Sequence, residues 1–268
     1  MPFCTHLLTF WKRRLNEIWP TNGWGSVEYG PAGGETAGQV VGGRWKPLHY
    51  WLRSHLFSTY FAACDVSGAC VVRNDSPLAP LAALLEVSAV STRSGMPLGT
   101  LSGPTPIALP RGAGAMAWGC MDGKGVPPGC APPSAVLGAA GCSPSGTDCA
   151  VLSVLRSAST GEELARNLQF WAVPSALQLA VGVTVTAKVG QQAADGSVPV
   201  TISVQGGAAL LVLLSSAAQG RWSDNALQLL APGLHQVVFL PMLQGGLGPP
   251  VDATLLTSSL RVEHLGQG

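Results

Sequence analysis

Two segments between residues 183 and 204 alternate apolar and polar residues with a period of two. VTVTAKV (183–189) and VPVTISV (198–204) each place aliphatic residues on one face and mainly threonine, serine or lysine on the other. Successive side chains of a strand point to opposite faces, so this period is typical of a β-strand with one buried face. The sequence predicts two strands here with these inward residues: Val183, Val185, Ala187, Val189, Val198, Val200, Ile202 and Val204. Pro199 cannot donate to a ladder and predicts an edge position for the second strand.

Further short apolar segments follow along residues 176–268. AALLVLLS, LHQVVFL and TSSLRVEHL are each typical of a strand, and glycine, proline and asparagine separate them. About five or six short strands with turn residues between them favour a β-sandwich.

Residues 61–175 contain a second set of predicted strands. CVVRNDSP ends in a turn signal, and LLEVSAV places Leu85, Val87 and Ala89 on one face and Glu86 and Ser88 on the other. From about residue 103 to 147, glycine and proline are too dense for a packed strand or helix. We expect a flexible Gly/Pro-rich insertion there, within a β-sandwich domain.

The first sixty residues have a different pattern. Residues 7–11 are apolar and lead into a polar turn, as at the end of a buried strand. In RWKPLHYWLRSHLF, the residues Trp45, Leu48, Leu52 and Leu56 have the spacing of an amphipathic helix, with Pro47 in its first turn. A strand, a loop and a helix in this order predict one βα unit.

Composition excludes several classes of partner. Of 268 residues, 47% are hydrophobic and 11% charged, and the net charge is +1. Beyond Lys12-Arg13-Arg14 there is no basic cluster, so binding to nucleic acid or to an anionic membrane is not expected. The apolar run at 208–214 is shorter than the about 18–20 residues that span a bilayer. The N-terminus does not have the pattern of a signal peptide.

No motif predicts a metal or a cofactor. The five histidines lack ligand spacing, and His49 is interpreted as a packing or capping residue. GxSxG, P-loop and dinucleotide fingerprints are absent. Among seven irregularly spaced cysteines, Cys64 and Cys70 are the candidate disulfide, and most of the others are predicted to be buried free thiols. The Asn74 sequon, NDS, is a weak match because Pro77 follows it directly.

Three segments resemble one enzyme family. FW..LNEIWPTNGWGSVEYG followed by GRWKPLHYWLRSHLF resembles a segment of the β-mannosidases of glycoside hydrolase family 2. CVVRNDSP resembles the start of the β-sandwich after the catalytic barrel of that family, and GRWSDNALQLLAPGLHQVVFLP resembles part of its final immunoglobulin-like domain. The segments occur in family order. Two additions, at 12–14 and 31–42, depart from the family pattern.

The resemblance implies a mainly β fold. Residues 1–60 would be the C-terminal remnant of a (β/α)8 barrel, its last βα unit. Residues 61–175 would form a β-sandwich with the insertion at about 103–147, and 176–268 a C-terminal immunoglobulin-like sandwich. Active sites of such barrels lie at the C-terminal ends of the strands. The implied substrate-binding residues there are Trp11, Asn16, Glu17 and Trp24, with Trp11 as a wall of the mannose subsite. For Trp24, packing within the loop is the alternative.

The implied activity is hydrolysis of terminal β-D-mannosides in oligosaccharides by the intact parent enzyme. A retaining glycosidase needs two carboxyl groups about 5–5.5 Å apart. The resemblance places both catalytic glutamates before Trp11, so no catalytic residue is assigned in this sequence, and the chain alone is predicted to be inactive. The alternative is a non-catalytic β-sandwich scaffold or carbohydrate-binding module. The family also implies a lysosomal, vacuolar or secreted location.

Two smaller interpretations concern later residues. Glu162 and Glu163 offer no facing pair and are expected to be solvated. In GRWSDN (220–225), Trp222 could be a sugar platform, but a structural turn is favoured, in which Asp224 and Asn225 bond to local backbone amides.

Overall fold

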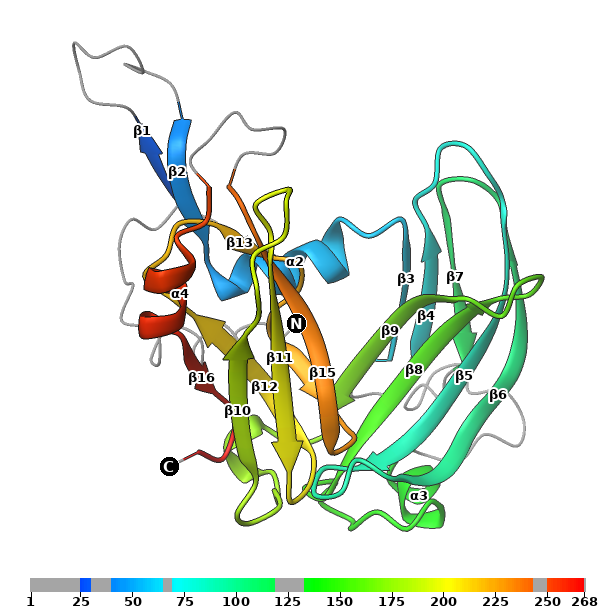
Figure 1. Ribbon diagram of the computed structural model, residues 1–268. Helices are drawn as coiled ribbons and strands as arrows, with labels where there is room; N and C mark the ends of the chain where they lie inside the picture. Colours follow the sequence, from blue (N-terminus) through cyan, green and yellow to red (C-terminus); the bar gives the residue numbers. More distant parts are fainter. Residues whose placement is uncertain (1–24, 30–39, 65–68, 119–132, 243–249, 268) are drawn as a thin grey trace. The chain divides into compact units, whose positions relative to one another are not determined.

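The computed structural model describes residues 25–29, 40–64, 69–118, 133–242 and 250–267, and the fold is mainly β (Figure 1). The described residues form two compact units, which we call terminal and central. The terminal unit joins the described residues up to Ser54 with those from Val181 onward, and the central unit is His55–Ala180. Both are built from antiparallel sheets, which confirms the mainly β, sandwich-like prediction.

The central unit contains two sheets. A three-stranded sheet has the order β3-β4-β7 and a four-stranded sheet the order β6-β5-β8-β9. Their bounds are β3 Tyr60–Cys64, β4 Cys70–Asn74, β5 Leu81–Ser91, β6 Pro97–Leu109, β7 Ala113–Trp118, β8 Cys149–Ser157 and β9 Glu163–Phe170. A short helix, α3 (Pro133–Ala139), precedes β8, and a 3-10 turn, η1 (Pro174–Ala176), follows β9.

One hydrophobic cluster fills the central unit. Leu85, Val87 and Ala89 of β5 are buried in it, as the period-two pattern predicts. The buried hydroxyl of Ser153 on β8 donates a 3.1 Å hydrogen bond to the carbonyl oxygen of Ala62 on β3, which ties the two sheets together. The segment CVVRNDSP forms β4 and its turn, but β3 precedes it as the first strand of the unit.

The predicted flexible insertion at 103–147 is wrong for much of its length. Residues 103–109 continue β6, residues 113–118 form β7, and residues 133–139 form α3, while 119–132 lie outside the described residues. The error arose because proline was taken as incompatible with a strand. β6 is the edge of its sheet, where a residue without an N–H can face away from the only neighbouring strand.

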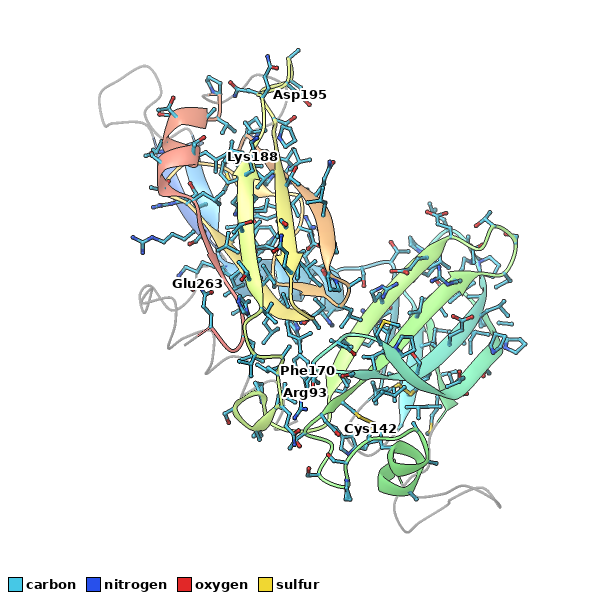
Figure 2. All side chains as sticks on the ribbon, turned by 60° about the horizontal axis from the view of Figure 1, so that its bottom comes forward. Arg93, Cys142, Phe170, Lys188, Asp195 and Glu263 are labelled. Carbon is cyan, nitrogen blue, oxygen red and sulfur yellow. A yellow bond between two sulfur atoms is a disulfide. The ribbon has the colours of Figure 1, made fainter. Side chains whose placement is uncertain are left out.

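Two disulfides lie in this core. Cys64 and Cys70 are directly paired across β3 and β4 and are bonded, as the sequence analysis proposed. Cys142 is bonded to Cys149, so the prediction of free thiols is wrong for this pair (Figure 2). Sequence spacing could not reveal the second bond, because the turn that returns the chain to β8 brings the two residues together.

The terminal unit contains a four-stranded sheet of order β10-β11-β15-β13, a three-stranded sheet of order β14-β12-β16 and the hairpin β1-β2. Strand bounds are β1 Gly25–Tyr29, β2 Val40–Trp45, β10 Thr184–Val189, β11 Val198–Gln205, β12 Ala209–Ser215, β13 Arg221–Trp222, β14 Leu227–Leu229, β15 Gly233–Leu240 and β16 Arg261–Glu263. The helices are α2 (Pro47–Leu56) and α4 (Ala253–Ser259).

The core of the terminal unit follows the predicted alternation. The four inward residues predicted for β11 are buried, and Val185, Ala187 and Val189 of β10 are half-buried against them. The segments AALLVLLS and LHQVVFL form β12 and β15 as predicted. The predicted helix is α2, with Pro47 as its first residue.

The edge position predicted for β11 is wrong. β11 lies between β10 and β15, and Pro199 is paired with Val238 of β15. The Pro199 carbonyl accepts a 2.8 Å hydrogen bond from Gly190, directly after the end of β10. The ring nitrogen of Pro199 therefore faces the side on which the neighbouring strand ends, so the missing donor interrupts no ladder.

The strand predicted from TSSLRVEHL is also partly wrong. Most of its first half belongs to α4, and only Arg261–Glu263 forms a strand, β16. The Asp252 side chain accepts a hydrogen bond from the Leu255 N–H and caps the helix, while Leu256 is buried in the core. The Asp252 N-cap and the burial of Leu256 favour a helix here, and they outweigh the β-propensity of the short segment that follows.

The barrel portion of the fold stays a prediction. The expected strand at 7–11 lies outside the described residues, and α2 is preceded by the antiparallel hairpin β1-β2. The predicted domain boundaries at 60/61 and 175/176 likewise stay predictions. Among the described helices, none is long and apolar enough to cross a membrane.

Replacing Gly103 should destabilise the central unit. Gly103 has a φ of +127°, and an added Cβ would lie 2.8 Å from the Leu85 carbonyl oxygen and 2.9 Å from the Glu86 Cα. We expect Gly103→Ala to lower the free energy of unfolding by about 1–3 kcal/mol in urea titrations. Gly138→Ala is the control, since nothing lies within 4 Å of its added Cβ. Equal stability of the two variants would contradict the packing described for β5 and β6.

Candidate functional site

The four substrate-binding residues predicted from the sequence, Trp11, Asn16, Glu17 and Trp24, lie outside the described residues. The first described element, β1, begins at Gly25, directly after Trp24. It pairs with β2, and β2 leads into α2 through Lys46. The described part of the chain therefore holds the elements that follow the predicted site.

Helix α2 is bonded to the segment GRWSDN in the terminal unit. The main-chain N–H of Trp222 donates a 2.7 Å hydrogen bond to the hydroxyl of Tyr50, which is 0% exposed. The guanidinium of Arg53, one turn further along α2, donates to the carbonyl oxygen of Ser223. Two of the segments that carry the family resemblance therefore meet, although more than 170 residues separate them along the chain.

The Tyr50 hydroxyl remains neutral in this environment. Burial raises the pKa of Tyr50 well above its usual value, and it outweighs the Trp222 N–H bond and the nearby Arg53, which act in the opposite direction. The hydroxyl is thus an uncharged acceptor inside the core, where the N–H of Trp222 would otherwise have no water to bond.

Trp45 lies at the end of β2 among aromatic and cationic groups. The His49 ring is 4.1 Å from the Trp45 ring, and the Arg221 guanidinium is 5.0 Å from its centroid. This is the geometry of a cation–π contact. Burial, and then the charge of Arg53, lower the pKa of His49, so this imidazole is neutral near pH 7. Its packing on Trp45 agrees with the structural role expected from the sequence.

A small pocket opens beside these groups, with a volume of about 80 Å³. The chain from Arg44 to Pro47 forms one wall, and Ser215 and Ser216 at the end of β12 form another. The remaining lining residues are Leu214, Ala218, Gly220, Trp222 and Phe239. Arg44 forms an isolated parallel bridge with Gly220, which fixes the backbone of that wall.

The pocket lining suits binding rather than acid–base chemistry. Among the described residues that line it, the polar ones are mainly Arg44, Lys46 and the two serines, and the lining contains no aspartate, glutamate, histidine or cysteine. Sequence analysis did not select these residues. The sequence feature that could have indicated this pocket was the run Arg-Trp-Lys at 44–46. Cations next to an aromatic residue are common on protein surfaces, so this run alone does not predict a binding site.

The segment GRWSDN is a structural turn. The side-chain amide of Asn225 donates to the Leu214 carbonyl at 2.8 Å, and its oxygen accepts from the Leu214 N–H at 2.9 Å. The Asp224 carboxylate accepts from the Asn225 N–H. Trp222 is 3% exposed and packs edge-on against Phe239, so the sugar-platform interpretation of Trp222 is wrong.

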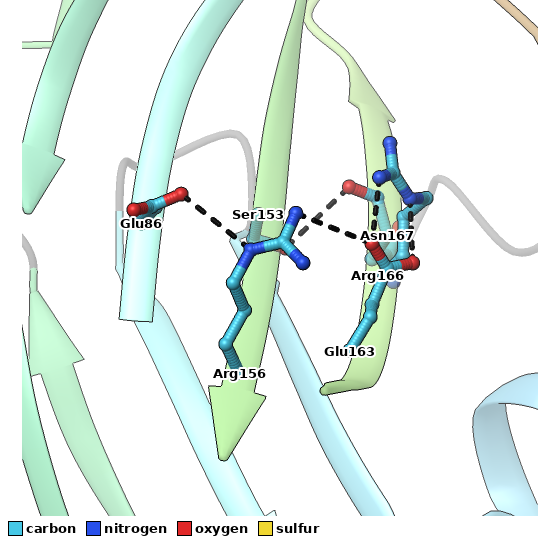
Figure 3. A network of polar contacts seen from close by, with 6 residues as sticks. All are labelled: Glu86, Ser153, Arg156, Glu163, Arg166 and Asn167. Atoms are coloured by element: carbon cyan, nitrogen blue, oxygen red, sulfur yellow. Dashed lines mark hydrogen bonds and ion pairs between the residues drawn. The ribbon is translucent and has the colours of Figure 1, made fainter. Parts of the chain in front are cut away.

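A polar network crosses strands β5, β8 and β9 of the central unit (Figure 3). Arg166 donates two hydrogen bonds, of 2.8 and 2.7 Å, to the Glu163 carboxylate, and Arg156 lies 3.6 Å from the same carboxylate. The bond from Arg166 is the main reason that the pKa of Glu163 is lowered. Glu163 is exposed, as predicted, and is in addition paired with two arginines. An ionised, paired carboxylate is a poor proton donor.

Two further motifs can be assigned from the described residues. Asn74 is 0% exposed, and its side-chain amide donates to the carbonyl oxygens of Ala79 and Pro110. This amide supports the turn after β4 and is inaccessible as a glycosylation acceptor in the folded chain. Within the described ranges, no group of three histidine, cysteine or acidic residues could hold a metal ion.

Comparison with known proteins gives matches only at the level of structure. No protein-family model matches the sequence, and no curated protein is significantly similar to it. The exo-chitosanase CsxA of Amycolatopsis orientalis has 15% identity and a TM-score of 0.49 over 82% of this chain and 27% of that enzyme. A structure of the same exo-β-D-glucosaminidase inhibited by a castanospermine analogue has 14% identity and a TM-score of 0.49. The chain thus spans about a quarter of the length of this glycoside hydrolase (27%), and a likeness of this size supports no conclusion about its activity.

Removing the Tyr50 hydroxyl should destabilise the terminal unit. Tyr50→Phe leaves the Trp222 N–H buried without its acceptor, which we expect to lower the free energy of unfolding by about 1–3 kcal/mol. The measurement is urea unfolding followed by tryptophan fluorescence. Tyr60→Phe is the matched control, because Tyr60 is only half-buried and we see no hydrogen bond from its hydroxyl to the described residues. An unchanged midpoint for Tyr50→Phe would show that the bond contributes nothing to the docking of α2.

Proposed function

We propose that this chain is the C-terminal portion of a β-mannosidase-like retaining glycoside hydrolase of family 2. The intact enzyme would hydrolyse terminal β-D-mannosides in oligosaccharides. Residues near the N-terminal end of the chain would complete the sugar site, with Trp11 as a wall of the subsite. Asn16 and Glu17 would orient the loop or bind hydroxyl groups, and Trp24 would stand at the rim of the site, since aromatic faces pack on sugar C–H groups and carboxylates accept from hydroxyls.

The observation that carries the proposal is the contact between two of the family-like segments. Tyr50 and Arg53 belong to GRWKPLHYWLRSHLF, and each bonds to the main chain of GRWSDN. If the likeness of either segment to the family were due to chance, there would be no reason for side chains of α2 to bond to the backbone of GRWSDN. Their direct bonding supports the interpretation of both segments as parts of one enzyme architecture.

On this proposal the chain supplies support and substrate contacts, and the catalytic glutamates belong to a preceding part of the enzyme. The described carboxylates that have close partners are engaged in structural bonds. Glu163 is held by Arg166, Asp148 accepts from Ser143, and Asp195 accepts from Ser197.

The alternative, a carbohydrate-binding module, receives no support from Trp222 or Trp45. Trp222 is 3% exposed, and Trp45 is covered by Arg221 and His49. A sugar platform requires an open ring face. The non-catalytic scaffold remains the second candidate function, supported by the anchoring of α2 on the terminal unit.

The test is an assay of the natural polypeptide that contains this sequence. An antibody raised against residues 181–240 would purify it from its source, and its length would be determined by mass spectrometry. We expect a longer polypeptide that hydrolyses 4-nitrophenyl β-D-mannoside with release of β-mannose as first product, as retention requires. The 268-residue chain, expressed alone, should give no turnover.

Substrate comparison separates the possible outcomes. Faster hydrolysis of the β-D-glucosaminide than of the β-D-mannoside would keep the glycosidase class and overturn the mannoside specificity. Absence of activity on every β-glycoside tested, with a polypeptide of 268 residues, would favour the scaffold. In an active enzyme, Trp11→Ala should raise KM much more than Trp222→Phe, since Trp222 is buried away from solvent.

A further inference from the structure

We propose that the pocket bounded by Arg44, Lys46 and Ser215 binds the oxyanion group of a small ligand, a phosphate, sulfate or carboxylate. The pocket lies wholly within the terminal unit, and its chemistry does not depend on a glycosidase activity. The argument rests on the charge, the hydrogen-bonding capacity and the size of the pocket.

The cations around the pocket are not neutralised within the described part of the chain. Arg44 and Lys46 line it, and Arg221 lies beside it over the Trp45 ring. The ion pairs of the described residues involve other cations, namely Arg73, Arg156 and Arg166. The whole chain has a net charge of only +1, so this positive region is local and not part of a general basic surface. Such a region attracts an anion.

Neutral donors complete the lining. Ser215 and Ser216 lie at the end of β12, and both residues are half-buried. The Ser216 hydroxyl is 2.9 Å from that of Ser259 and accepts the Ala218 N–H, so its position is fixed. We see no hydrogen bond from the Ser215 hydroxyl to the described residues, so it can donate to a ligand. Charged and hydroxyl donors together are the groups that oxyanions require.

Gly220 holds the cationic wall in place. Its backbone is bridged to Arg44, and its φ is +150°. An added Cβ would lie 2.5 Å from the Phe239 ring and 2.6 Å from the Leu240 carbonyl oxygen. A glycine at this position therefore lets the chain before β13 lie directly against β15, and its bridge to Arg44 joins the two walls of the pocket.

The aromatic contacts favour an anionic group over a whole sugar ring, and the pocket is large enough for such a group. The pocket volume of about 80 Å³ exceeds the roughly 10–15 Å³ that, on the same measure, holds one water molecule. A phosphate, sulfate or carboxylate group fits such a space. The Trp45 ring, which would be the stacking platform for a sugar, carries the Arg221 guanidinium instead.

Titration of the complete chain with sodium phosphate, sodium sulfate and sodium acetate tests the proposal. Binding would be followed by ¹H–¹⁵N NMR at constant ionic strength, with attention to the amide signals of residues 44–46 and 215–216. We expect saturable shifts at these residues. A larger affinity for phosphate and sulfate than for acetate would identify a tetrahedral oxyanion as the ligand group, and the reverse order would identify a carboxylate.

Paired variants separate the pocket from general charge effects. Arg44→Gln with Lys46→Gln should weaken binding by about tenfold or more, because two charge-assisted hydrogen bonds are lost. Lys188→Gln with Arg261→Gln is the matched control, since it removes two exposed cations of the same unit outside the pocket lining and should leave the affinity unchanged. Figure 2 shows Lys188 on β10. Ser215→Ala gives a second, uncharged test and should weaken binding with little effect on stability.

The proposal would be overturned by the absence of saturable shifts at the pocket for all three anions. It would equally be overturned if both double variants weakened binding to the same extent, since that would show a diffuse charge effect. Thermal unfolding of each variant confirms that the fold is retained. β-Mannosidase activity of the natural polypeptide does not enter these measurements, so failure of this proposal is distinct from failure of the proposed function.

Discussion

The terminal unit depends on one buried polar contact between distant parts of the chain. Tyr50 is completely buried, and its hydroxyl accepts the main-chain N–H of Trp222 at 2.7 Å. β13 is only two residues long, so few ladder bonds hold it on β15. The Tyr50 hydroxyl is the hydrogen-bond acceptor for a backbone N–H of this short strand, and the Tyr50 ring packs in the hydrophobic core beside it. Without this contact, α2 would lose its buried polar anchor to the sheet and keep the bond from Arg53 to the Ser223 carbonyl.

That contact also determines where the surrounding groups lie. Once α2 is fixed, β2 ends beside Gly220 and places Trp45 under Arg221. The aromatic ring is thereby occupied by a cation, and the adjacent Arg44 and Lys46 line the pocket. A cation–π contact contributes little energy at a partly exposed site, so its main consequence here is geometric. The Arg221 guanidinium covers a face of the Trp45 ring, and positive charge lies beside the pocket.

The core strands could be predicted from the sequence because the alternation of apolar and polar residues lies within each strand. The valines of β11 and the alternation in β5 are local patterns of period two, and burial follows the pattern residue by residue. Prolines gave the main errors. Pro199 lies in an interior strand and the prolines of β6 in a packed edge strand, because the effect of a missing N–H depends on what lies opposite it. Which residue lies opposite a proline depends on how the strands pair in the sheet, and the sequence of one strand does not contain this information.

The sequence by itself determined the mainly β class, the inward faces of the long strands and helix α2, and it identified Cys64 and Cys70 as the candidate disulfide. These features depend on residues close together in the chain. Only the tertiary structure decided the second disulfide, the burial of Trp222, the pairing of Glu163 and the pocket at Arg44 and Lys46. Apart from the disulfide, each of these arises where separate strands, or a strand and a helix, meet. Local periodicity carries no information about which segments become neighbours, because long-range pairing is fixed by the packing of the whole unit.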